Sequence, residues 1–410
     1  MSGTRLPDAP WLREGPLPRL LAALNRDGEE ARIVGGAVRN ALIGQPVGEV
    51  DLATTALPDE VSRRVSAAGF RVVPTGIEHG TVTAVADGHP FEITTLRKDI
   101  ETFGRHAKVA YGRDWKADAQ RRDFTMNALS ASADGTVHDY VGGLADLEKR
   151  RVRFIGDAQT RIAEDYLRIL RFFRFHASYG RGEPDPDGLA ACIAGRAGLD
   201  QLSRERVRME LMKLVVAPHA AEAVVVMADS GLLITVLGGV PDLGGFANMI
   251  KIEAALGFEP DPMRRLGALA VRVPEDALRL WQRLRLSNAE HDRLAYMANG
   301  WWRVSPGADR EGRELLYRLG PERFVDRVVL AWSRSQAAAT DSAWHALATL
   351  PQRWTAPVFP LKADDFLKRG IAKGPALGAA LRAAEEAWIA ADFPEGPVAI
   401  AGIADAAAKT

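Results

Sequence analysis

Cysteine, long apolar runs and net charge are all scarce in this chain of 410 residues. The single cysteine, Cys192, excludes an intramolecular disulfide and a zinc cluster built from cysteines. No apolar run approaches the length of about 18 residues that a membrane span needs, and the N-terminus lacks a signal-peptide pattern, so we expect a cytoplasmic protein without a membrane partner. The 53 Lys and Arg balance the 53 Asp and Glu, so a polyanion would be bound at local basic patches rather than by overall charge.

The pattern of strand and helix signals changes along the chain. Up to about residue 140, short strands alternate with helices, and beyond residue 155 alanine- and leucine-rich helical windows replace them. Segment 97–113 is polar, charged and punctuated by glycine, which predicts a mobile loop. We therefore expect an α+β protein, with a mixed α/β head followed by an all-helical remainder. Strands are predicted at 31–34, 49–53, 70–73, 81–86 and 91–96.

A glycine pair follows the first predicted strand. Gly35 and Gly36 predict a tight turn into a short helix that ends near Leu42. Glycine lets backbone N–H groups approach a phosphate closely, and a helix N-terminus favours an anion. Arg39 adds a guanidinium that is able to hold phosphate oxygens. An ordinary turn without a ligand is the alternative, because most glycine pairs are simply turns.

Three carboxylates are candidates for metal ligation. Glu49 and Asp51 are two residues apart on a predicted strand, so both side chains leave the same face, with Cα atoms about 6.6 Å apart. Such a pair can hold two divalent ions roughly 3.5–4 Å apart, as in phosphoryl transfer. Glu92 faces away from its apolar neighbours on the strand that follows the predicted Asp87-Gly88 hairpin turn, and is a candidate third carboxylate. Solvated surface acids are the alternative, and for Glu92 the two interpretations are nearly balanced.

Two further segments carry arginines. The first is predicted to open a helix and contains Arg121, Arg122 and Asp123, with the arginines placed for a triphosphate. A capping Asp123 with surface arginines is the alternative.

The second segment, 164–174, is predicted to be one helix that is apolar over most of its circumference. Charges on a mostly buried helix need partners or a ligand, and the alternative to a ligand is an internal ladder of ion pairs. In that ladder, Arg168 would pair with Glu164 and Asp165. The charges that follow one another at three-residue steps are Asp165, Arg168, Arg171 and Arg174.

In this order and spacing, these motifs resemble the bacterial tRNA nucleotidyltransferase (CCA-adding enzyme) and poly(A) polymerase family of the polymerase-β-like nucleotidyltransferase superfamily. The resemblance is detailed from Ile33 to His176 and continues more weakly through Leu202–Arg206. It implies a nucleotidyltransferase head at 1–140, and a neck with a base-reading helix and RNA-binding region at 141–235. It further implies a helical body and tail that contact tRNA at 236–410.

The resemblance also implies roles for individual residues. The turn Gly35-Gly36 and Arg39 would contact the nucleotide, Glu49 and Asp51 would hold Mg²⁺, and Arg122 would contact the triphosphate. The base of the incoming nucleotide would be read by Asp165, Arg168, Arg171 and Arg174. The chain departs from the family at two positions: Asn40 and Glu49 stand where the family usually has Asp.

We therefore expect addition of CCA to the 3′ end of tRNA from CTP and ATP, with release of pyrophosphate. A poly(A) polymerase usually has a basic C-terminal extension, whereas residues 351–410 contain seven Lys and Arg and seven Asp and Glu. An enzyme that adds only the two cytidines would lack a full loop before Arg121. A catalytically weak RNA-binding protein is the alternative from another class. The basic patch expected to contact RNA is 147–174, with eight Lys and Arg against four Asp and Glu. Protein partners are not predicted.

Overall fold

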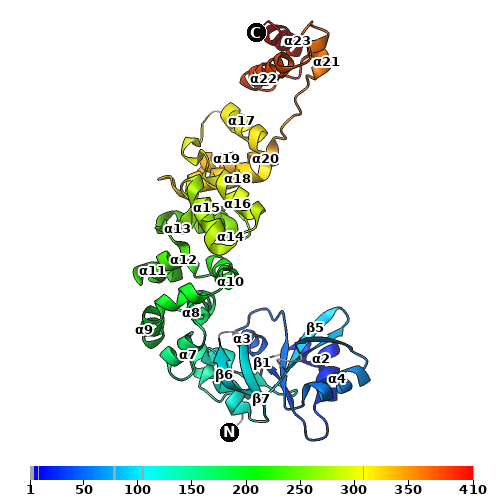
Figure 1. Cartoon of the computed structure of the whole chain (residues 1–410), viewed down its shortest axis with the longest axis vertical. Helices are drawn as coiled ribbons and strands as arrows, with labels where there is room; N and C mark the ends of the chain where they lie inside the picture. Colours follow the sequence, from blue (N-terminus) through cyan, green and yellow to red (C-terminus); the bar gives the residue numbers. More distant parts are fainter. Residues whose placement is uncertain (1–3, 8, 77–79, 104–105, 308, 410) are drawn as a thin grey trace. The chain divides into compact units, whose positions relative to one another are not determined.

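The computed structural model describes residues 4–7, 9–76, 80–103, 106–307 and 309–409, and describes the backbone alone at 74–76, 98–103 and 106–109. By its internal contacts the chain divides into two compact units, residues 1–236 and 237–410. Strands are confined to the first part of the first unit, and from α6 (Gly143–Glu148) onward the described residues form helices and connections only (Figure 1). The expected α+β class, a mixed head followed by helices, is confirmed.

The head contains a seven-stranded sheet in the order β3-β4-β5-β2-β1-β8-β9. The pairing of β2 with β5 is parallel, and the other pairings are antiparallel. The predicted strands at 31–34 and 81–86 are confirmed residue for residue, whereas β2 begins at Asp51 rather than at Glu49. The strands are β1 (Ala31–Val34), β2 (Asp51–Thr54), β3 (Arg71–Gly76), β4 (Thr81–Ala86), β5 (His89–Thr95), β8 (Ser130–Ala131) and β9 (Val137–His138).

The segment expected to be a loop at 97–113 is instead a hairpin. Strands β6 (Arg97–Phe103) and β7 (His106–Tyr111) pair antiparallel as a two-stranded sheet, with a register shift between Asp99 and Glu101. The prediction of a loop was wrong because the two strands are joined by backbone hydrogen bonds to each other, which polar composition does not reveal.

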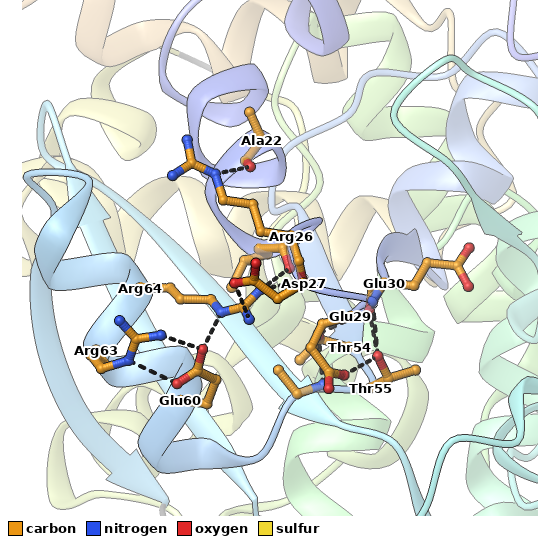
Figure 2. Close-up of polar contacts among 12 residues, drawn as sticks. Ala22, Arg26, Asp27, Glu29, Glu30, Thr54, Thr55, Glu60, Arg63 and Arg64 are labelled. Atoms are coloured by element: carbon orange, nitrogen blue, oxygen red, sulfur yellow. Dashed lines mark hydrogen bonds and ion pairs between the residues drawn. The ribbon is translucent and has the colours of Figure 1, made fainter.

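A buried arginine joins two helices of the head. Arg64 of α4 (Pro58–Ala67) donates to the carbonyl oxygens of Leu24 and Arg26, at 3.0 and 2.8 Å, at the C-terminal end of α2 (Pro16–Leu24). Figure 2 shows this guanidinium together with its two acidic partners, Asp27 and Glu60. A cation at the end of a helix satisfies carbonyl groups that lack partners within the helix. The contact therefore fixes α2 against α4.

Aromatic packing connects the head to the helices that follow it in the first unit. Phe124 is fully buried, and its ring centre lies 4.9 Å from that of Phe154 and 5.1 Å from that of Phe175 on α8 (Leu167–Tyr179). Phe172 of the same helix stacks on Phe154 at 5.5 Å. These contacts place α8 directly beside the segment that contains Arg122. The remaining helices of this unit are α1 (Pro10–Arg13), α3 (Gly36–Leu42), α5 (Trp115–Gln120), η2 (Thr125–Asn127), α7 (Ala158–Glu164), α9 (Pro186–Ala194), η3 (Arg196–Gln201), α10 (Arg204–Val215), α11 (Ala220–Asp229) and α12 (Leu232–Leu237).

The described residues of the second unit form helices and the connections between them. Its core includes Trp332 and Phe324 of α18 (Pro321–Ser333), both fully buried. Beside this core, Asp326 accepts hydrogen bonds from Arg264 and Arg293, which joins three helices. Across the described residues of both units, no helix has the length and apolar character to cross a membrane. The helices are α13 (Leu243–Leu256), α14 (Pro262–Ala270), α15 (Pro274–Leu284), α16 (Asn288–Ala298), η4 (Trp301–Arg303), α17 (Asp309–Leu319), α18 (Pro321–Ser333), α19 (Ser342–Ala348), α20 (Leu350–Arg353), α21 (Ala363–Leu367), α22 (Pro375–Ala390) and α23 (Pro397–Ala407).

Candidate active site

The glycine turn has the predicted form. Strand β1 ends at Val34, Gly35 follows with φ of 68°, and α3 begins at Gly36. A positive φ of this size favours glycine, because a Cβ atom would clash with the backbone. The N–H of Gly35 donates to the carbonyl oxygen of Leu129 at 3.0 Å, which ties the turn to the segment after Arg122. The turn therefore has a fixed backbone beside the arginine motif.

Arg39 is buried and makes several contacts within the protein. Its Nη1 donates to Oδ1 of Asn127 at 2.5 Å, and its Nη2 donates to the hydroxyl of Tyr179 at 2.7 Å and to Oδ1 of Asn40 at 2.9 Å. The guanidinium also lies 3.8 Å from the ring centre of Tyr179. A Cβ atom built on Gly36 would lie 3.6 Å from Nη2. The structure thus brings Arg39 to the glycine turn but gives its guanidinium partners in α3, η2 and α8.

The three candidate carboxylates lie on, or just before, two neighbouring strands of the sheet. Asp51 is the first residue of β2 and pairs with Val34, the last residue before the glycine turn. In the parallel pairing of β2 with β5, Leu52 lies opposite Ile93, so Asp51 and Glu92 each immediately precede a paired residue. Glu92 is exposed between buried neighbours, as predicted, and Glu49 is exposed outside the strand. Asp51 is therefore central to the group.

The other two acids contribute to a raised pKa of Asp51. Asp51 is open to solvent on one side, yet desolvation by neighbouring protein atoms raises the pKa of its carboxyl. The negative charges of Glu92 and then Glu49 raise this pKa further, and the positive charge of Arg122 lowers it. Carboxylates that destabilise one another as anions gain from a bound cation. The donor set consequently fits a divalent metal ion.

A metal ion at this site would have few ligands from the protein. Among the described residues, no group of three or more His, Cys, Asp or Glu side chains has an arrangement that would hold a metal ion by itself. Mg²⁺ is commonly bound through one or two carboxylates, with water and substrate phosphates as the other ligands. Glu49 and Asp51 suit this kind of incomplete site, in which the substrate supplies part of the coordination.

Arg122 follows helix α5, and the segment predicted to open a helix contains only the short 3-10 helix η2 (Thr125–Asn127), which corrects the prediction. Helix α5 ends at Gln120, Arg121 and Arg122 lie in the turn after it, and Phe124 forms a bridge with Phe154. The guanidinium of Arg122 nevertheless lies at the glycine turn, since a Cβ atom built on Gly35 would be 3.5 Å from Nη1. The polar segment predicts the start of a helix, but the helix of this region, α5, lies before the arginines and ends at Gln120.

Asp123 is an ion-pair acceptor rather than only a cap. Its Oδ2 accepts from Nε and Nη2 of Arg171 at 2.8 and 2.6 Å, and its Oδ1 accepts from Nδ2 of Asn127 at 3.2 Å. Burial raises the pKa of Asp123, but the charge and hydrogen bonds of Arg171 outweigh burial, so the pKa lies below its ordinary value. Asn127 thus links Asp123 to Arg39. The sequence reasoning did not identify Asn127, because an asparagine in a short turn gives no distinctive signal.

The predicted helix at 164–174 is interrupted. Helix α7 ends at Glu164, Asp165 has an extended backbone, and α8 begins at Leu167. The Oδ1 atom of Asp165 accepts from the N–H of Leu167 at 3.1 Å, and its carboxylate pairs with Arg206 of α10. Hydrogen bonding to the local backbone is the usual way in which Asp competes with a continuous helix.

Each of the four residues expected to read the base has a partner of opposite charge. Arg168 pairs with Glu164, as one part of the ion-pair alternative predicted, but Asp165 pairs with Arg206 and not with Arg168. Arg174 Nε donates to Oε2 of Glu210 at 2.5 Å. Arg171 bridges the two elements, with Nη1 3.6 Å from Oε1 of Glu210 and its other edge on Asp123. Next to Asp165, a cavity of about 600 Å³ opens between α7 and α10.

The basic patch at 147–174 is largely neutralised by partners. Lys149 is exposed and Arg150 is partly exposed, and neither forms an ion pair with another described residue. The other arginines of this segment outside α8 have acidic partners. These pairs are Arg151 with Asp185, Arg153 with Asp146, and Arg161 with Glu164.

Comparison with known proteins agrees with these assignments of fold and family. Residues 31–153 match the Poly A polymerase head domain, and residues 183–243 match the probable RNA and SrmB-binding site of polymerase A. The chain is 36% identical over 380 residues to the mitochondrial CCA tRNA nucleotidyltransferase 1 of Mus musculus, and the aligned region covers 91% of this chain and 86% of that protein. It is 31% identical over 377 residues to the CCA-adding enzyme of Lactobacillus johnsonii, covering 90% and 91% of the two chains.

Solved structures give the same result. The CCA-adding enzyme of Bacillus stearothermophilus, determined in complex with CTP, matches with a TM-score of 0.75 at 29% identity and covers 94% of each chain. The CCA-adding enzyme of Thermotoga maritima shares the fold, with a TM-score of 0.70 at 16% identity. These matches confirm the resemblance inferred from the motifs. The chain belongs to the family of CCA tRNA nucleotidyltransferases.

Proposed function

We propose that this chain adds cytidine and adenosine nucleotides to the 3′ end of tRNA without a template, using CTP and ATP and releasing pyrophosphate. The observation that carries the proposal is the carboxylate group at Asp51. Its anion is destabilised by desolvation and by the charges of Glu92 and Glu49, and it pairs with Val34, directly before the glycine turn that Arg122 contacts. Family membership supports the same reaction.

We propose Mg²⁺ as the metal, held by Glu49 and Asp51. When bound, it would lower the pKa of the attacking 3′-hydroxyl and stabilise negative charge on the leaving group. The protein groups then have distinct tasks. Asp51 is the central ligand, Glu92 is the candidate third carboxylate, and Arg122 presents positive charge to the triphosphate. Positioning and electrostatics supply the catalysis, and no covalent intermediate on the protein is needed.

Base choice is proposed to rest on Asp165 and Arg168. Cytosine and adenine each present an amino donor beside a ring-nitrogen acceptor, whereas uracil and guanine present the reverse order. A carboxylate acceptor beside a guanidinium donor therefore fits the first two bases and opposes the others. Because Asp165 pairs with Arg206 and Arg168 with Glu164, reading a base requires both side chains to share or exchange these partners.

The tRNA is proposed to contact the segment that we assign to the neck, 141–235, and the body and tail, 236–410. The match of residues 183–243 to an RNA-binding family supports the first of these assignments. The cytoplasmic location expected from the sequence stays part of the proposal.

The test is incubation of the full chain with tRNA that lacks its last three nucleotides, in Mg²⁺, with CTP alone, ATP alone and both together. We expect two additions with CTP and completion only when ATP is also present. Repeated addition of adenosine with ATP alone would instead indicate a poly(A) polymerase. Binding of tRNA without any incorporation would indicate an RNA-binding protein and would overturn the proposal.

A further inference from the structure

A buried acid lies directly behind Arg122. Asp118 on α5 is only 3% exposed, and the two arginines that follow α5 both donate to it. Arg121 Nε donates to Oδ1 at 2.7 Å, while Nη2 and Nε of Arg122 donate to Oδ2 at 3.1 and 3.3 Å. Burial raises the pKa of Asp118, but the charges of Arg122 and Arg121 outweigh burial, so the pKa lies below its ordinary value. Asp118 is therefore a buried anion with two cationic partners.

The guanidinium of Arg122 has different neighbours on its two sides. The edge formed by Nε and Nη2 faces Asp118, while Nη1 lies near Gly35, 3.5 Å from a Cβ atom built there. The side chain of Arg122 is 22% exposed, against 4% for Asp118, so Arg122 is the partner that meets solvent. Its charge also reaches Asp51. Arg122 thus lies between a buried acid and the proposed nucleotide site.

We propose that Asp118 is a positioning residue, which holds Arg122 in the orientation that meets the triphosphate of the incoming nucleotide. The inference rests on the proposed function, because it requires a nucleotide at Arg122. An arginine side chain has many rotamers, and ordering it at the moment of binding weakens affinity. Asp118 fixes the rotamer during folding and leaves Nη1 for the ligand, so the ordering is complete before CTP arrives. The acid itself does not contact the nucleotide.

The spacing of Asp118 from its partners follows the helical repeat. Arg121 and Arg122 are three and four residues after Asp118, the separations at which side chains meet on one face of a helix. Both ion pairs therefore form at the C-terminal end of α5, whose last residue is Gln120. This spacing is a signal present in the sequence that identifies Asp118 once the helix is known.

The experiment measures binding of CTP by isothermal titration calorimetry in the presence of Mg²⁺. Asp118→Asn keeps the shape of the side chain and removes its charge, and we expect affinity for CTP to fall about tenfold or more, the effect of one hydrogen bond between charged groups. Arg122→Gln should weaken binding at least as much. The double variant should bind CTP no more weakly than Arg122→Gln alone, because Asp118 acts through Arg122. Asp118→Glu keeps the charge and should recover part of the loss.

A matched control is available in the second unit. Asp326 is 2% exposed and, like Asp118, accepts from two arginines, with Arg264 Nε at 3.1 Å and Arg293 Nε at 2.6 Å. Asp326→Asn should lower the melting temperature and leave affinity for CTP unchanged. If Asp118→Asn does not fold, Asp118→Glu serves for the same comparison. We expect Asp118→Glu to weaken CTP binding when Arg122 is present and to cause no further weakening when it is combined with Arg122→Gln.

Each outcome decides the proposal. Wild-type affinity in Asp118→Asn, or losses that add fully in the double variant, would overturn the role of Asp118. A wild-type chain that binds CTP through Arg122 but adds no nucleotide to tRNA would overturn the proposed function while the positioning role remains. A wild-type chain that does not bind CTP would overturn both.

Discussion

Asp165 and Arg206 form a two-point ion pair, in which Oδ2 accepts from Nη2 at 2.6 Å and Oδ1 accepts from Nη1 at 3.2 Å. The pair joins the break between α7 and α8 to α10. A bidentate pair of this kind fixes the plane of the carboxylate as well as its position. Arg206 therefore sets the orientation in which Asp165 lies before any nucleotide binds.

The first prediction uses this pair to test base choice. Asp165→Ala should let UTP or GTP be incorporated, because removing the carboxylate removes a repulsive contact with the wrong bases. Incorporation of CTP and ATP should lose about 1.5–3 kcal/mol of transition-state stabilisation, the contribution of one hydrogen bond to a charged group. The measurement is single-nucleotide incorporation with each of the four nucleotides.

Arg206→Gln is the control for Asp165→Ala. It keeps the acid but removes the partner that orients it, so we expect a lower melting temperature and a smaller loss of base discrimination than in Asp165→Ala. If Asp165→Ala loses stability while its selectivity is unchanged, then Asp165 is part of the scaffold and the base-reading assignment is wrong.

The second prediction concerns the proposed metal ligands. Asp51→Ala and Glu49→Ala should each abolish nucleotide addition without unfolding the head, because both remove a carboxylate that is exposed rather than packed. Glu49→Asp should keep or raise activity, since Asp is usual at this position in the family. Chelation of divalent ions with EDTA should stop the reaction, and added Mg²⁺ should restore it.

The control for the metal ligands is Asp59→Asn, which changes an acid of the first turn of α4. Its activity should match that of the unaltered chain. Glu92→Gln tests whether Glu92 is a third catalytic carboxylate or only an exposed acid near the site. A loss of activity as large as in Asp51→Ala would place Glu92 among the essential acids. Turnover by Asp51→Ala comparable to that of the unaltered chain would exclude the two-ligand assignment.

The third prediction is a dependence of stability on pH through Asp123 and Arg171. The folded-state pKa of Asp123 is lowered, so the stability gained from its anion is fully present above the unfolded pKa of about 3.9 and is lost as pH falls through the folded value. Asp123→Asn should therefore unfold more easily than the unaltered chain at pH 7. The difference in free energy of unfolding should shrink progressively below about pH 4.

Urea unfolding at several pH values measures this dependence. Asp157→Asn is a useful comparison, because Asp157 is an exposed cap whose pKa is lowered mainly by its hydrogen bonds to Thr160. Its substitution should change stability much less than Asp123→Asn. A difference for Asp123→Asn that stays constant between neutral and strongly acidic pH would contradict an ionised Asp123 in the folded chain.

The fourth prediction concerns binding of tRNA. Affinity should fall steeply with salt even though the chain has no net charge, because local contacts to phosphate release counterions. About six contacts would reduce affinity roughly a thousandfold between about 50 and about 200 mM salt. Replacing Lys149 and Arg150 with Gln should lower both the affinity and the slope, because their charges lack acidic partners among the described residues.

Arg26→Gln is the matched control, an exposed arginine of the same unit that follows α2. It should leave the salt dependence unchanged. A binding constant for tRNA that hardly varies over this range of salt would argue against phosphate contacts and against an RNA substrate.

The sequence by itself determined the parts of this protein that depend on neighbouring residues. Strand β1, the turn at Gly35 and α3 appear where the apolar run and the glycine pair predict them, because a short buried run and a positive φ are local properties. The alternation around Glu92 likewise predicts its exposed position between buried neighbours. Motif order was sufficient to identify the family.

Only the tertiary structure decided which charges pair and where helices break. Arg171 meets Asp123 across 48 residues of sequence, and Arg206 meets Asp165 across 41, distances at which composition and periodicity carry no information. The ion-pair ladder considered as the alternative within one helix does not hold for Asp165, because a long-range partner and a local backbone hydrogen bond were both available to its carboxylate. The physical reason is general: buried charge is stable only where folding supplies its partner, and that partner comes from whichever element packs beside it.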